Sequence, residues 1–387
     1  MHRAIIFNCI VFFVLTNSYA LYGQEEEGEY YLLTDMNVQI DVTSAINNMY
    51  NFKFEEADKQ YRWLKQEYPW HPLPYFLLGL SQWWRMIPNL SNTKYDQKLE
   101  AYMDTAIVLS KNLYKKKERN IEAAFFLAGA YAFQARLYSE RKKWRKTASV
   151  GKSALKYMNE ARGHEDFSPE ILFGEALYNY YSVWVSENYP LLKPILVFFK
   201  KGDKELGIEQ LKTVASNAFY TRTEAQYFLM RILSSENIDR AYAFQVSKYL
   251  YNTFPDNAYF HRYYARLLYS KRQFHTLEKV ASQIVERIDS GKVGYEEISG
   301  RYASFFLGQI YESFGKQEKA IKYYYRSVEF SEKINALETG YYHYSMLALA
   351  EIAKEKGERK EAKKWVKKIK KNAKRKSQVH KRARELL

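Results

Sequence analysis

Apolar residues recur at intervals of three and four along most of the chain, which is the spacing of helices with one buried face. Residues 304–327 show this pattern most clearly. Gly308 lies on the apolar face of the first half, and Ala320 and Tyr324 lie on the apolar face of the second half. Gly315 separates the halves and is the residue type that most often ends a helix. The stretch therefore predicts two amphipathic helices folded back on each other.

Small residues in these helices indicate where two helix axes cross closely. Gly308 and Ala320 are twelve positions apart, with Leu307 before the glycine and Tyr311 three residues after it. A side chain larger than a methyl group at such a crossing would push the helices apart. These residues and their offsets resemble a tetratricopeptide repeat (TPR). The resemblance implies a non-enzymatic array of helix pairs that binds a partner protein or peptide on its concave side.

The same pattern recurs along the chain and predicts an all-α, TPR-like α-solenoid, in which antiparallel helix pairs form a right-handed superhelix. We expect about seven pairs between residues 41 and 371. Small crossing residues fall at Ala265, Gly308 and Ala350, which are 43 and then 42 residues apart. This spacing exceeds the minimal repeat of about 34 residues, so the helices or loops must be longer than in a regular array.

Residues 1–20 have the order of features of a cleaved signal peptide. A short basic start is followed by an apolar run over residues 4–15, and small residues precede a cleavage position near Ala20. We therefore expect an exported protein of bacterial type, in the periplasm or associated with the envelope. Residues 21–40 would form an acidic leader.

Composition supports a folded array and excludes thiol chemistry. Hydrophobic residues make up 47% of the 387 residues, which is too many for a disordered chain. The one cysteine, Cys9, lies inside the predicted signal peptide. The exported chain would then contain neither disulfides nor a catalytic thiol.

Residues 188–201 interrupt the helical pattern within one predicted pair. Pro190 and Pro194 exclude a continuous helix there. The apolar run 195–199 is far too short to span a bilayer. Two interpretations remain for this Pro-rich insertion: a loop packed on the array, or a segment that contacts a membrane surface or a groove in a partner.

Residues 76–84, 172–181 and 189–211 also resemble, more weakly, the eukaryotic inclusion-body-clearance family of TPR proteins. That family carries a similar proline-interrupted apolar loop before a helix that starts with Gly-Asp, and it is implicated in lipid-linked proteostasis. The exported N-terminus departs from it, so the resemblance implies architecture only.

No motif for catalysis or cofactor binding is present. Gly151-Lys152-Ser153 has the ending of a phosphate-binding loop, but Lys146 stands where that loop needs its first glycine. The histidines do not have the spacing of metal ligands. We therefore expect no enzyme activity, no cofactor and no metal.

The concave side of the array is the expected site for a partner protein or peptide. Arg262 and Arg266, which lie between tyrosines, are the clearest candidates because arginine can hold a carboxylate with two hydrogen bonds. The alternative is a solvated repeat face. The full set of candidate contact residues is Phe76, Trp83, Arg262, Arg266, Tyr269, Tyr302 and Gln309.

Positive charge is concentrated at the C-terminus. Residues 354–387 contain 16 Lys and Arg against four carboxylates, which accounts for +12 of the formal net charge of +16. This basic region, with its tail at 372–387, is either a solvated capping helix or a contact for anionic lipid. Nucleic acid is not expected for an exported protein. The candidate contacts are Lys363, Lys367, Lys370, Lys371 and Lys374.

These observations favour a non-enzymatic binding scaffold or adaptor of the bacterial cell envelope, with a partner protein or peptide on its concave face. The alternative is a peripheral membrane protein that contacts anionic lipid or an envelope polymer through residues 188–201 and the basic C-terminal helix.

Overall fold

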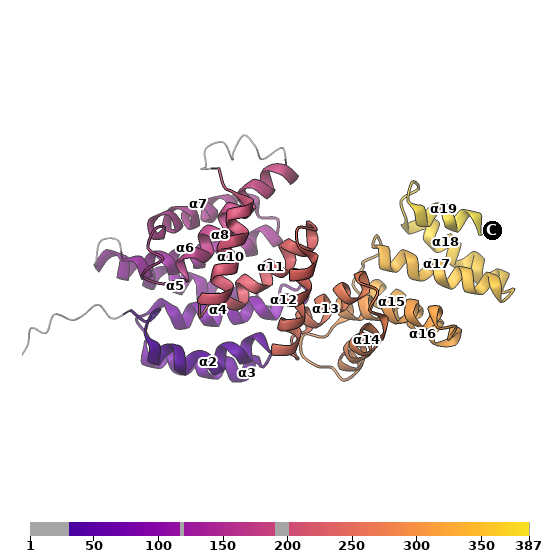
Figure 1. Cartoon of the computed structure of the whole chain (residues 1–387), viewed down its shortest axis with the longest axis horizontal. Coiled ribbons are helices and arrows are strands. Elements are labelled where there is room, and N and C mark those ends of the chain that lie inside the picture. Colours follow the sequence, from indigo (N-terminus) through magenta and orange to yellow (C-terminus); the bar gives the residue numbers. More distant parts are fainter. Residues whose placement is uncertain (1–30, 117–119, 190–200, 387) are drawn as a thin grey trace, which may run out of the picture.

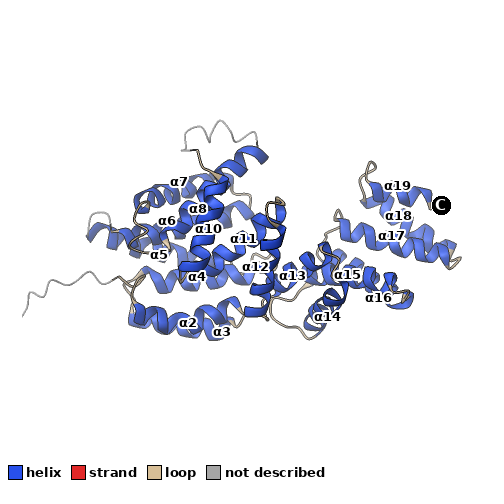
Figure 2. Ribbon diagram, viewed as in Figure 1, coloured by secondary structure: helices blue, strands red, loops and turns tan. Residues whose placement is uncertain are grey.

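The computed structural model describes residues 31–116, 120–189 and 201–386. Every regular element within these ranges is a helix, so the predicted all-α class is confirmed (Figure 2). In chain order the helices are α2 (Met36–Tyr50), α3 (Phe54–Glu67), α4 (Pro72–Met86), α5 (Asp96–Lys116), α6 (Ile121–Glu140), α7 (Trp144–Ala161), α8 (Ile171–Asn188), α10 (Lys204–Asn217), α11 (Arg222–Ser235), α12 (Arg240–Thr253), α13 (Ala258–Ser270), α14 (Phe274–Asp289), α15 (Glu297–Ser313), α16 (Gln317–Lys333), α17 (Gly340–Glu355), α18 (Arg359–Asn372) and α19 (Gln378–Glu385).

Consecutive helices pack in pairs, and the pairs follow one another along the molecule, as expected for a solenoid (Figure 1). The described residues contain eight pairs, from α2 with α3 to α17 with α18, where the sequence indicated about seven. The pair α8 and α10 is the one that residues 189–203 separate. The additional helix, α19, packs on α17 and α18.

Six of the pairs are joined by the same tight turn. In each, the second residue after the first helix has a positive φ. In the pair α15–α16, the N–H of Gly315 donates to the carbonyl of Glu312 at 3.0 Å, and the N–H of Lys316 donates to Tyr311 at 2.8 Å. Such bonds satisfy carbonyls that the helix end leaves free. The positive-φ residues are Phe52, Lys142, Asn237, Arg272, Gly315 and Gly357.

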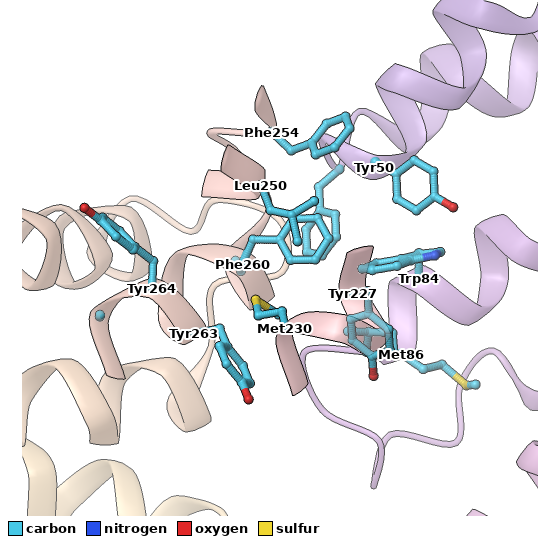
Figure 3. Close-up of a cluster of buried hydrophobic side chains, with 14 of the residues drawn as sticks. Tyr50, Trp84, Met86, Tyr227, Met230, Leu250, Phe254, Phe260, Tyr263 and Tyr264 are labelled. Carbon is cyan, nitrogen blue, oxygen red and sulfur yellow. The ribbon is translucent and has the colours of Figure 1, made fainter. Parts of the chain in front are cut away.

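The N-terminal pairs curve until helices far apart in the sequence touch (Figure 3). Trp84 of α4 donates its indole N–H to Glu224 of α11, with 2.6 Å between Nε1 and Oε1. The Trp84 ring also lies edge-on to Tyr50, Tyr227 and Phe260, with centroids 5.0, 5.6 and 5.4 Å away. We call α2 to α13 the closed body. Helices α15 to α19 extend away from it (Figure 1).

Polar contacts to main-chain groups reinforce this closure. The side-chain amide of Asn257 donates to the carbonyl of Tyr50 at 2.7 Å. The N–H of Asp256 donates to the Asn51 side chain at 2.8 Å. Because these bonds satisfy helix ends on both sides, they fix the first pair against the start of α13.

Glycine permits close helix contacts at several positions, including Gly308 and Gly207. A Cβ on Gly308 would lie 2.5 Å from Cε1 of the buried Tyr324. The Tyr324 ring has little freedom to move, because its hydroxyl accepts from Gln309 at 2.5 Å and donates to Glu312. A Cβ on Gly207 would lie 2.7 and 2.8 Å from backbone atoms of α8. The expected close approach at Gly308 therefore exists, with the ring of Tyr324 as the neighbour.

Several sequence-based predictions lie outside the described residues: the signal peptide at 1–20, the leader up to residue 30, and most of the insertion at 188–201. Within the described part, Leu32 and Leu33 are fully buried and α2 begins at Met36. The folded region therefore starts before residue 41.

The C-terminal segment continues the fold instead of ending at residue 371. Helix α19 has a Ser377 cap, whose side chain accepts from the N–H of His380 at 3.3 Å. Val379 and Ala383 of α19 are buried in the core. Part of the predicted basic tail is thus packed against the last pair.

Replacing the close-contact glycines should lower stability. We expect Gly207→Ala and Gly308→Ala each to reduce the free energy of unfolding by about 1–3 kcal/mol, because the new methyl group has no space. Gly151→Ala is the matched control. A Cβ there meets no atom within 4 Å, so alanine should stabilise helix α7 by about 0.5–1 kcal/mol. Urea unfolding followed by circular dichroism measures all three. Equal effects at all three positions would contradict the assignment.

Candidate binding surfaces

Arg262 lies inside the molecule and not on an open face. It is 8% exposed, and its guanidinium donates to the carbonyl of Pro88 at 3.1 Å and to the Ser299 hydroxyl at 3.3 Å. Burial lowers the pKa of Arg262, since the charged form is poorly solvated there. Arg262 therefore links α13 both to the loop after α4 and to α15.

Arg266, one turn further along α13, is exposed and lies against aromatic rings. Its guanidinium carbon is 5.1 Å from the ring centroid of Tyr263 and 5.5 Å from that of Tyr302. Arg301 of α15 lies 5.1 Å from the same Tyr302 ring. Arg301 is 8% exposed, and its Nε has no hydrogen-bond partner. The face of a tyrosine ring attracts a cation but does not neutralise it.

Contacts between arginine and tyrosine also occur on α11. Arg231 donates to the Tyr227 hydroxyl at 2.6 Å. Tyr259 lies between Arg231 and Arg262: burial raises its pKa, and both arginines act against that rise. We name this set the arginine–tyrosine strip. It comprises Arg231, Arg262, Arg266 and Arg301 with Tyr227, Tyr259, Tyr263 and Tyr302, on α11, α13 and α15.

The strip lacks carboxylate partners. None of its four arginines forms a salt bridge within the part of the chain that the structure describes. Glu296 is the carboxylate that acts on Arg262, and burial raises the pKa of Glu296. Arginines are rarely buried unless paired. The strip therefore holds positive charge that an anionic ligand could neutralise with charge-assisted hydrogen bonds.

The other predicted partner contacts are mostly packed into the core. Trp83 is fully buried, with the Arg136 guanidinium 4.2 Å from its ring centroid. Tyr269 stacks on Phe306 at 4.6 Å. Gln309 bonds the Tyr324 hydroxyl. Tyr302 belongs to the strip, whereas Phe76 lines a cavity within the closed body.

This cavity has a volume of about 340 Å³ and lies among α4, α6, α7, α8 and α11. We call it the apolar cavity, because aliphatic and aromatic side chains form nearly all of its wall. Small residues of α6 leave room for it, with Gly174 of α8 also in the wall. The charged residues in the wall are Arg136 and Glu224. Further lining residues include Leu77, Phe125, Ala128, Gly129, Ala132, Phe133, Ala154, Leu155, Met158, Leu177, Tyr181 and Phe228.

The buried glutamates of the closed body have structural partners. Glu170 accepts hydrogen bonds from backbone N–H groups that lie just before α11, including that of Thr221 at 2.8 Å. Burial raises the pKa of Glu170, and these bonds act to lower it. Glu122 accepts from the N–H of Leu33 at 2.6 Å and lies 3.0 Å from Nε2 of His71. Both carboxylates are therefore already bonded to groups of the protein itself.

The lysines predicted to contact lipid lie on the solvent side of α18 and just after it. All five are exposed and form no salt bridge among the described residues. Their neighbours Lys364 and Lys368 are paired, with Glu361 and Glu332. The opposite side of α18 buries Trp365 against the core. The five lysines are Lys363, Lys367, Lys370, Lys371 and Lys374.

Sequence reasoning missed Arg136, Arg231 and Arg301. A usable signal was present, because Tyr227 precedes Arg231 by four positions, and the same spacing separates Tyr259 from Tyr263 around Arg262. Residues three or four apart share one face of a helix. The apolar cavity had no such signal, since its wall comes from five helices.

No protein-family model matches this chain, and no curated protein matches it significantly. Among the described residues there is no group of His, Cys, Asp and Glu side chains that could hold a metal ion. No helix in the described ranges is long and apolar enough to cross a membrane.

Substitution tests the finding that Arg262 is buried and Arg266 is exposed. Arg262→Ala should lower the free energy of unfolding by about 2–4 kcal/mol, because it removes buried packing and leaves the Pro88 carbonyl without a donor. Arg266→Ala should change it by less than about 0.5 kcal/mol, as for exposed positions generally. Urea denaturation of both variants is the measurement. A large loss for Arg266→Ala would show that it, too, is structural.

Proposed function

We propose that this protein is a non-enzymatic binding scaffold that holds an acidic segment of a partner protein on the arginine–tyrosine strip. The observation that supports the proposal most is the set of arginines with aromatic neighbours and no carboxylate partners. Guanidinium groups bind carboxylates with paired hydrogen bonds. Tyrosine faces add apolar contact area at little cost in side-chain entropy.

We further assign the helix pairs to the TPR type. The close helix contacts at Gly207 and Gly308 and the shared in-pair turn support this assignment. An array of this kind presents an extended surface to a peptide. Export to a bacterial periplasm or envelope, inferred from residues 1–20, completes the proposal.

The strip favours an extended acidic peptide because its charges are spread over three consecutive pairs. Arg231, Arg266 and Arg301 lie on α11, α13 and α15. An extended segment could contact Arg266 and Arg231 together, while Arg301, which is 8% exposed, would add positive potential from below the surface. Electrostatic attraction of this kind weakens as salt screens exposed charges.

Binding of a labelled ten-residue glutamate peptide tests the proposal. We expect Arg266→Glu to weaken binding at low salt at least tenfold, because a bidentate donor becomes a repelling carboxylate. Fluorescence anisotropy measures the change. The matched control is Arg240→Glu, at an exposed position on α12 outside the strip, and it should change affinity less than about threefold. If both variants lose binding equally, the effect is net charge alone and the strip is not the site.

A second candidate function rests on the five unpaired lysines near α18. We propose that this face attaches the protein peripherally to an anionic lipid surface. Each well-placed lysine near such a surface contributes about 1 kcal/mol. Helices α18 and α19 bury Trp365, Val366 and Val379, so deleting the region would also damage the core. Substitution of the lysines is therefore the cleaner test.

Changing Lys363, Lys367, Lys370, Lys371 and Lys374 together to Gln should abolish co-flotation with phosphatidylglycerol vesicles. The matched control is five exposed lysines elsewhere, changed in the same way: Lys59, Lys98, Lys152, Lys248 and Lys279. The control has the same net charge, so it should float nearly as well as the unchanged protein. Equal flotation of the two variants would refute a specific lipid-binding face.

A further inference from the structure

The apolar cavity is a space that the side chains of the described residues do not fill. The C-terminal half of helix α7 lines it, from Ala154 to Ala161, yet Ala161 is the one residue of α7 that is buried. Leu155 and Met158 face the cavity and stay partly exposed, as does Leu177 of α8. Protein interiors normally pack without such gaps. At about 340 Å³, the cavity lies in the size range of small-molecule sites, about 300–1,000 Å³.

The wall chemistry favours an alkyl chain over a peptide as the occupant. A peptide brings an N–H and a C=O at nearly every residue, and each needs a hydrogen-bond partner once it is buried. The wall offers few polar groups, and Glu224 is already bonded to Trp84. An alkyl chain needs no such partners and gains free energy for each methylene that leaves water.

One end of the cavity carries positive charge. The Arg136 guanidinium is part of the wall and donates to the Tyr227 hydroxyl at 3.1 Å, and Arg231 donates to the same oxygen at 2.6 Å. Neither arginine forms a salt bridge within the described ranges. Tyr181 of the wall lies close to both: burial raises its pKa, and the two arginines oppose that rise.

Glu224 is the acidic group of the wall and already accepts a hydrogen bond from outside it. Its Oε1 is held by the Trp84 indole. Burial raises the pKa of Glu224, although Arg136 acts to lower it. No salt bridge joins Glu224 to Arg136 among the described residues. A ligand carboxylate could therefore still pair with Arg136.

We propose that the apolar cavity binds a single-chain fatty acid, with its alkyl chain between α6, α7 and α8 and its carboxylate against Arg136. The alkyl chain fills the space beside α7, and the carboxylate supplies the salt-bridge partner that Arg136 lacks among the described residues. This site meets the strip at Tyr227 but does not include Arg266, so Arg266→Glu and Arg136→Met test the two proposals separately.

Palmitate is the probe for the full-length protein, and isothermal titration calorimetry is the measurement. We expect one molecule to bind per chain, with affinity rising about fourfold per methylene through a series of shorter saturated acids. Hexadecanol, which has no charge, should bind at least tenfold more weakly than palmitate. If palmitate does not bind, or if the two ligands bind equally, the proposal is wrong.

Two variants locate the site. Arg136→Met keeps an unbranched apolar stem and removes the charged guanidinium, so it should weaken palmitate at least tenfold and leave hexadecanol unchanged. Ala132→Phe should fill the cavity and abolish binding of both ligands. The matched control is Ala101→Phe on α5, an exposed position outside the wall, which should bind as the unchanged protein does. Unaltered binding by Ala132→Phe would place the ligand elsewhere and overturn the proposal, as would uptake of palmitoyl phospholipid from vesicles without binding of free palmitate.

Discussion

The contact of Trp84 with Glu224 determines the shape of the N-terminal half. It joins α4 to α11 across 140 residues of sequence, and the aromatic rings of Tyr50, Tyr227 and Phe260 surround it. A solenoid whose pairs touch only their neighbours would stay open. Here the buried indole N–H needs an acceptor and the buried carboxylate needs a donor. The bond between Trp84 and Glu224 satisfies both groups. Their bond holds the curve that encloses the apolar cavity.

Closure has a consequence for charge. It brings arginines from several pairs onto shared tyrosines, as with Arg136 and Arg231 on Tyr227. Ring faces and hydroxyl groups stabilise these cations only in part. A buried guanidinium without a carboxylate, such as Arg301, reduces stability unless another group compensates for the lost solvation of its charge. An anionic ligand would do so, which is why both the strip and the cavity point to carboxylates.

The two halves are therefore suited to different occupants. The closed body contains a partly open apolar cavity, which suits a small chain-like ligand. Helices α15 to α19 extend away from this body (Figure 1). Their exposed faces, including the lysines near α18, suit large partners or surfaces.

The sequence by itself determined the local fold. Helix periodicity, the small residue at Gly308 and the turn at Gly315 all act within about twenty residues, so the helix pairs could be predicted. Tertiary structure alone decided the sites. Arg262 shares the sequence pattern of Arg266, but curvature buries the first against Pro88 and leaves the second exposed. The curvature is the sum of small packing angles between many successive pairs, so it cannot be predicted from any single stretch of sequence.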